Sequence, residues 1–129
     1  MGKKKRGTQE AATMTEPVAV ESTVDNLRGN LEEIKTYEGV IGYILRNSTS
    51  ATIDLKDPTK IIDYAILSSS SVDASQELSE LFDLGDVKKI ILEGKEVKIL
   101  SLTIDENKVS IFTEKNVDQE KILKRIRST

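Results

Sequence analysis

The predicted strands of this chain carry large apolar side chains on both of their alternating faces. In the first strand, Val40 and Ile44 alternate with Ile41 and Leu45, and the later segment Val97–Ile104 shows the same pattern. A sheet with one face in water would alternate apolar and polar residues instead. The sequence therefore predicts a sheet that is covered on both faces.

Periodicity and turn residues place the helices and strands in a definite order. We expect helices at about Val24–Ile34, at Lys60–Leu84 and after Asn116, and strands at Val40–Leu45, Ala51–Leu55, Val87–Glu93, Val97–Ile104 and Val109–Thr113. Short turns join neighbouring strands, which makes most of the pairing antiparallel. The predicted fold class is α/β, a three-layer α-β-α sandwich around a five-stranded, mainly antiparallel sheet, in the order helix-strand-strand-helix-strand-strand-strand-helix.

The long central helix has two faces to cover. One face is mostly apolar, with Tyr64, Leu67, Ser71, Ala74, Leu78 and Leu81, and the next is mostly small, with Ile61, Ala65, Ser68, Val72, Ser75, Ser79 and Phe82. Because small side chains allow close approach, we expect the second face to meet a partner and the first to pack on the chain's own sheet. Gly85 is expected in the left-handed conformation that ends the helix. The serine run 68–71 lowers helix propensity, so a break there stays open.

Composition argues against a catalytic site. The chain has no Cys and no His, which removes thiol nucleophiles, disulfides, zinc fingers and the commonest general base near neutral pH. Gly94-Lys95 does not fit a phosphate-binding loop, because that motif needs Gly where this chain has Lys89 and Ser or Thr where it has Glu96. We expect no catalytic, cofactor-binding or metal site and no cofactor.

Residues 1–22 differ in composition from the rest of the chain. They contain Lys3–Arg6, followed by small and polar residues with almost no large apolar side chains. Such a segment cannot offset its ordering entropy, so we expect a disordered basic and polar tail ahead of one domain at 23–129. The net charge of −3 and the absence of Trp argue against specific nucleic-acid binding. The apolar runs are too short for stable membrane insertion, and we expect a cytoplasmic protein.

Several stretches resemble landmarks of the Roadblock family. They are Glu38–Gly42 at the start of the first strand, Ile62–Ala65 early in the long helix, Leu84–Val87 and Ile91–Gly94. The likeness covers roughly Leu27 to Ile126. It departs at the turn Asn47–Ser50, where the family often has an acidic residue and Gly. None of these landmarks is catalytic, so the resemblance implies a function through association.

The resemblance implies a homodimer in which the long helices lie side by side and the third strands join two sheets. The residues expected at that interface are Ala65, Ser68, Val72, Ser75, Ser79, Val87, Lys89 and Ile91. The chain offers its own reason, because the third strand is expected at a sheet edge, and an open apolar edge favours aggregation. The family further implies an adaptor or regulator that binds a Ras-like small GTPase and modulates its nucleotide cycle or localisation. A profilin-like or longin-like ligand-sensing or scaffold module is the alternative.

Overall fold

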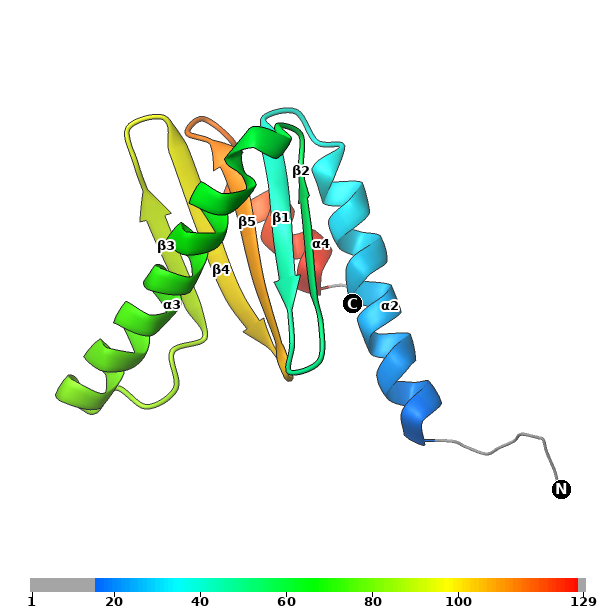
Figure 1. Cartoon of the computed structure of the whole chain (residues 1–129), viewed down its shortest axis with the longest axis vertical. Coiled ribbons are helices and arrows are strands. Elements are labelled where there is room, and N and C mark those ends of the chain that lie inside the picture. The colour runs from blue at the N-terminus through cyan, green and yellow to red at the C-terminus, as the bar shows by residue number, and fades with distance from the viewer. Residues whose placement is uncertain (1–15, 128–129) are drawn as a thin grey trace, which may run out of the picture.

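The computed structural model describes residues 16–127, which form a five-stranded sheet with helices on both faces (Figure 1). In chain order the elements are α2 (Glu16–Lys35), β1 (Val40–Arg46), β2 (Ala51–Leu55), the 3-10 helix η1 (Pro58–Lys60), α3 (Ile61–Phe82), β3 (Lys89–Glu93), β4 (Val97–Ile104), β5 (Asn107–Glu114) and α4 (Gln119–Arg127). The strand order is β2-β1-β5-β4-β3, and all neighbours are antiparallel. The predicted fold class and element order are confirmed. Within residues 16–127, no helix is long and apolar enough to cross a bilayer.

Several element boundaries differ from those expected. Helix α2 begins at Glu16 rather than near Val24 and so includes the last residues of the predicted tail; residues 1–15 of that tail lie outside the described residues. Once a packed stretch has nucleated a helix, further turns add without an apolar stripe, which periodicity cannot detect. β3 begins at Lys89 and β5 at Asn107, two residues after and two residues before the predicted starts.

Two apolar cores lie on opposite faces of the sheet. The larger one, under α2 and α4, consists of Leu27, Leu31, Ile34, Val40, Tyr43, Leu45, Leu100, Val109, Ile111, Ile122, Leu123 and Ile126. The smaller one, under the start of α3, consists of Ile44, Leu55, Ile99 and Phe112, with Ile41, Ile53, Ile61, Tyr64 and Ala65 packed against it. The Tyr64 ring stacks on Phe112 with a centroid distance of 4.7 Å. Strands β1, β4 and β5 thus supply the two cores with alternate residues, which explains the apolar side chains on both faces.

Two glycines allow the close approaches at the entry to β1. Gly39 has a φ of 84°, and a Cβ there would lie 2.4 Å from Cγ2 of Val117. Gly42 lies at an irregularity of the β1–β5 pairing. A Cβ at Gly42 would lie 2.3 Å from the backbone oxygen of Asp54 and 2.7 Å from Cα of Leu55, both on β2. Side chains are therefore excluded at both positions, which explains these two landmarks of the Glu38–Gly42 stretch.

A polar cluster ties α2 to β1 and β2. Lys35 forms an ion pair with Asp54, and the Tyr43 hydroxyl donates a hydrogen bond to the Glu32 carboxylate. The hydrogen bond from the Lys35 ammonium lowers the pKa of Asp54 below its ordinary value. Burial, reinforced by the bond to Glu32, raises the pKa of Tyr43. Folding therefore favours the charged form of Asp54 and the neutral form of Tyr43.

We predict that Asp54→Asn lowers the free energy of unfolding by about 1 kcal/mol at pH 7, because a charge-assisted bond is lost at a partly exposed site. A carboxyl whose pKa is lowered by folding stabilises the protein above its unfolded pKa, and that stability is lost as the pH falls through the folded pKa. The difference from the unmutated protein should therefore fade below about pH 4. Urea unfolding at pH 7, 5 and 3 measures it, with Asp73→Asn on the exposed side of α3 as control. A difference independent of pH would contradict the prediction.

Candidate interface on helix α3 and strand β3

Helix α3 is continuous through the serine run 68–71, so the break left open by the sequence does not occur. The buried Ser68 Oγ lies 2.6 Å from Oγ of Ser110 on β5, which lies 2.9 Å from Oγ of Ser101 on β4. The Ser71 hydroxyl donates to the carbonyl oxygen of Leu67 at 2.7 Å. The hydroxyls thus bond to the sheet or to an accessible carbonyl and leave the helix intact.

The small face of α3 is turned toward the chain's own sheet, so its predicted orientation toward a partner is wrong. Of the mostly apolar face, Tyr64 packs on the sheet as expected, whereas Leu67, Leu78 and Leu81 are exposed. The members of the small face that were expected at a dimer interface are Ala65, Ser68, Val72, Ser75 and Ser79; they pack beside the smaller core, bond to β5 or line a cavity over the sheet. Ser68 is only 5% exposed. The reason lies in the sheet, because Ser101 and Ser110 offer hydroxyls that need short polar partners above them.

The opposite flank of α3 exposes large apolar side chains. We call it the outer stripe, and it consists of Leu67 (39% exposed), Ala74, Leu78 (51%) and Leu81 (71%). On the other flank, Ser69 accepts a hydrogen bond of 3.2 Å from Arg46 at the end of β1. At about 100° per residue, Leu78 lies on the far side of the helix from Ser69. The outer stripe therefore faces away from β1, toward the side of β3, which α3 crosses obliquely (Figure 1).

Strand β3 lies at the edge of the sheet, as the sequence predicted. No strand of residues 16–127 lies along its outer side, and its Ile91 side chain is 44% exposed. Two of the three residues predicted for the interface in this region, Lys89 and Ile91, are on the strand. Val87 precedes the strand and is among the residues that line the cavity under α3. An edge of this kind offers backbone hydrogen-bonding groups to a further strand.

The helix end adds apolar surface near this edge. α3 ends at Phe82, two residues earlier than predicted, with Asp83 in the left-handed conformation at a φ of 54°. Gly85 also has a positive φ of 75°, as expected, although it follows the cap rather than forming it. The Leu84 amide donates to the carbonyl of Ser79 at 3.0 Å. Phe82 and Leu84 remain exposed at this terminus.

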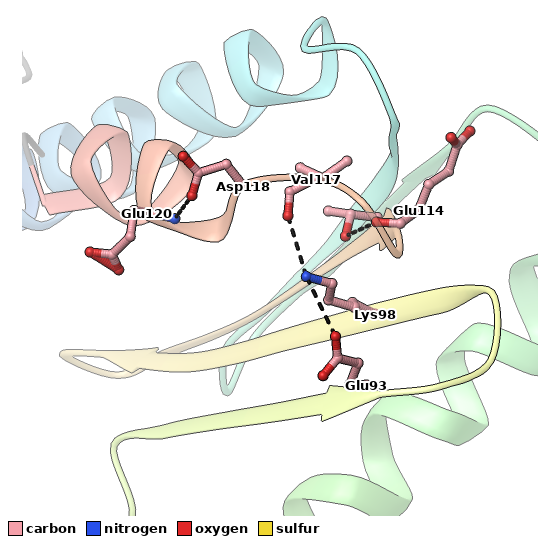
Figure 2. A network of polar contacts seen from close by, with 7 residues as sticks. Glu93, Lys98, Glu114, Val117, Asp118 and Glu120 are labelled. Atoms are coloured by element: carbon pink, nitrogen blue, oxygen red, sulfur yellow. Dashed lines mark hydrogen bonds and ion pairs between the residues drawn. The ribbon is translucent and has the colours of Figure 1, made fainter.

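Charge is distributed unevenly over the candidate interface. The stretch from Ile61 to Val87 contains no Lys or Arg, and its acidic residues are Asp63, Asp73, Glu77, Glu80, Asp83 and Asp86. At the end of β3, Glu93 lies 3.8 Å from the Lys98 ammonium, which also donates to the carbonyl oxygen of Val117 at 3.4 Å (Figure 2). The solvent side of α3 outside the apolar stripe is therefore negative.

A cavity of about 600 Å³ lies under the second half of α3. Its lining includes small and polar side chains from both layers, among them Ser75, Ser79, Ser101, Thr103, Lys108 and Ser110. The Ser75 hydroxyl donates to the Val72 carbonyl at 2.8 Å, and the Ser79 hydroxyl donates to the Gly85 carbonyl. The small face thus leaves open space over a polar sheet surface.

Comparison with known proteins identifies the fold. No family model and no curated protein sequence matches the chain. Among solved structures, the Roadblock/LC7 domain from Streptomyces avermitilis matches with a TM-score of 0.62 at 14% identity, covering 80% of this chain and 87% of that chain. The gliding protein MglB from Thermus thermophilus matches with 0.62 at 13%, covering 83% and 84%. An MglB with a tetrameric arrangement matches with 0.57 at 16%, covering 91% and 87%. At these identities the likeness concerns the fold, and the chain has the fold of the Roadblock/LC7 domain.

Proposed function

We propose that this protein is a non-catalytic homodimeric adaptor or regulator that binds a Ras-like small GTPase and modulates its nucleotide cycle or localisation. The observation that carries the proposal is the apolar outer stripe of α3 lying beside the open edge of β3. Contiguous apolar surface next to an unpaired strand edge is typical of a protein–protein interface. The Roadblock fold supports the choice of partner, because the resemblance to that family implies GTPase binding.

A second copy of the chain suits this surface. It would cover the outer stripe with its own outer stripe and pair its β3 with the open edge. One symmetric contact would then bury the exposed apolar side chains and satisfy the unpaired backbone groups of β3. The tetrameric arrangement reported for one MglB gives independent support, since it shows self-association on the same fold. The small face of α3 stays on its own sheet in this dimer. The outer stripe therefore takes the place of Ala65, Ser68, Val72, Ser75 and Ser79 as the proposed helix contact.

The proposal is tested with Ras-like GTPases encoded in the same genome, each loaded with GDP or with a non-hydrolysable GTP analogue. Isothermal titration should show binding to one nucleotide state at least tenfold tighter than to the other, because a regulator of the cycle must discriminate between the states. The acidic surface of α3 should make that affinity fall as salt rises. Failure to bind in either nucleotide state would contradict the proposed GTPase partner, but it would not bear on the proposed homodimer.

We predict that no arginine of this domain acts as a catalytic finger. Arg46 is bonded to Ser69, Arg125 pairs with Glu33 at 2.8 Å, and Arg28 and Arg127 lie within helices. Each Arg→Ala variant should therefore change partner-stimulated single-turnover GTP hydrolysis by less than about tenfold, or about 1.4 kcal/mol. An arginine finger contributes on the order of a thousandfold or more, so a loss of that size in one variant would overturn the non-catalytic mechanism.

The cavity under α3 favours one alternative, a profilin-like or longin-like ligand-sensing or scaffold module. A volume of about 600 Å³ is in the range of small-molecule sites. Thermal-shift screening with small metabolites tests this function. A ligand that raises the melting temperature of the unmutated protein and fails with Ser75→Phe, which fills the cavity, would support the sensor. Leu78→Asp in the outer stripe should keep such a response, because the outer stripe does not line the cavity.

A further inference from the structure

We infer that two copies of this chain join their β3 strands in a single register, with Ile91 on the two-fold axis and Lys89 of each copy opposite Glu93 of the other. This inference rests on the proposed homodimer and adds its specificity-determining contacts. Three observations carry it: the direction of the backbone groups along β3, the pairing of β3 with β4, and the placement of charge around Ile91.

The backbone of β3 is divided between its neighbour and the open edge. Lys88 accepts a hydrogen bond on its carbonyl from the Thr103 amide at 3.3 Å, and the Gly94 amide donates to the Val97 carbonyl at 2.9 Å. Backbone groups alternate in direction along an antiparallel strand. The even-numbered residues thus bond to β4, and the N–H and C=O groups of the odd-numbered residues 89, 91 and 93 point outward.

This alternation limits the registers that a second β3 can adopt. Outward groups of one strand must face outward groups of the other, so odd-numbered residues lie opposite odd-numbered residues. The numbers of two opposed residues then always add to the same even value. The two-fold axis therefore passes between one residue, whose number is half that value, and the same residue of the other copy. Such an axis is perpendicular to the sheet and keeps both α3 helices on the same face, where their outer stripes can meet. The candidate central residues near the middle of the strand are Ile90, Ile91 and Leu92.

Charge separates these three registers. With Ile91 at the centre, Lys89 of each copy faces Glu93 of the other, which gives two opposite-charge pairs, and Ile91 faces Ile91 of the other copy. With Leu92 at the centre, Lys89 would face the other copy's Lys95, a like-charge pair. With Ile90 at the centre, Glu93 would face Val87 and Lys89 would face Ile91, so no opposite-charge pair would form between the two strands. Opposite charges directly across an antiparallel pair stabilise it, whereas like charges destabilise it.

The charged pairs lie on the sheet face away from α3. Lys89 pairs in register with Leu102 and Ile91 with Leu100 on β4, and these two leucines face the core under α2 and α4. Directly opposed residues share a face. The register contacts are therefore separate from the outer stripe, so each can be changed without touching the other.

Cysteine cross-linking reads the register, because the chain contains no Cys of its own. In the proposed register, Ile91→Cys places two thiols on a hydrogen-bonded pair with Cα atoms about 5.5 Å apart, within the range of about 4.4–6.8 Å for disulfides. Oxidised glutathione should convert most of this variant to a covalent dimer. Ile90→Cys and Leu92→Cys should cross-link at least tenfold more slowly, since their equivalents are offset by two residues along the strands.

The outcomes separate this inference from the proposed function. Light scattering that reports a dimer for the unmutated protein, together with cross-linking only at residue 91, supports both. A dimer that cross-links at residue 90 or 92, or at none of the three, overturns the register and leaves the homodimer standing. An unmutated protein that is monomeric at micromolar concentration overturns the homodimer and the register together.

Mixing charge variants tests the pairs themselves. Lys89→Glu and Glu93→Lys should each dimerise about tenfold more weakly, because each brings two like-charge contacts to the axis. Mixed in equal amounts, they should recover near-native affinity as a heterodimer, since both contacts become opposite in charge. Lys56→Glu mixed with Glu38→Lys carries the same charge changes near the other end of the strand order and should show no such preference. An equal heterodimer preference in both mixtures would reject the Lys89–Glu93 contacts.

Discussion

Replacing both Leu67 and Leu78 with Asp should turn the proposed dimer into a folded monomer. The two leucines are 39% and 51% exposed in the single chain and would be buried in the dimer, so the substitution removes four apolar side chains from one interface. Even partial burial of four leucines contributes about 4 kcal/mol or more, which corresponds to at least a thousandfold change in Kd. Size exclusion with light scattering should report about one chain mass, 14.3 kDa, where the unmutated protein reports two.

The matched control is Ile62→Asp. Ile62 is 72% exposed but lies on the flank of α3 that carries Ser69, so the same chemical change should leave the dimer intact. Cooperative unfolding followed by circular dichroism shows that each variant is folded. Dissociation by Ile62→Asp and not by the outer-stripe variant would place the interface on the other flank.

Replacing Gly42 with Ala should destabilise the domain by about 3 kcal/mol, the upper end of the cost of overpacking. The new Cβ would lie 2.3 Å from the Asp54 oxygen and 2.7 Å from Cα of Leu55. Both are backbone atoms, so the conflict cannot be relieved by a rotamer change, and β1 and β2 would have to separate. For a domain of this size the melting temperature should fall by roughly 10 °C or more.

Gly29→Ala serves as the control for that variant. Gly29 lies in α2, and a Cβ there would meet nothing within 4 Å. Ala is favoured over Gly in a helix by up to about 1 kcal/mol, so this substitution should raise the melting temperature. A similar loss of stability in both glycine variants would show that the cost at Gly42 does not come from the contact with β2.

The sequence predicted only in part the surface that we propose as the interface. The edge position of β3 followed from the order of its turns, and Lys89 and Ile91 lie on that strand as expected. The sequence also shows the apolar stripe of α3, but its periodicity led us to expect that this stripe packs on the chain's own sheet. The signal that would have corrected it is the pair Ser101 and Ser110, which interrupts the apolar residues on one face of β4 and β5 and calls for a polar, small helix face above it.

By itself the sequence determined the secondary structure order, the antiparallel sheet and its two covered faces, because these follow from local periodicity, turn residues and glycine positions. Only the tertiary structure decided which face of α3 packs inward. That choice depends on Ser68 meeting Ser110, which is 42 residues away in the chain, and on the space left between helix and sheet. A helical repeat indicates that two faces exist, but the surface that each one meets is set by residues distant in sequence.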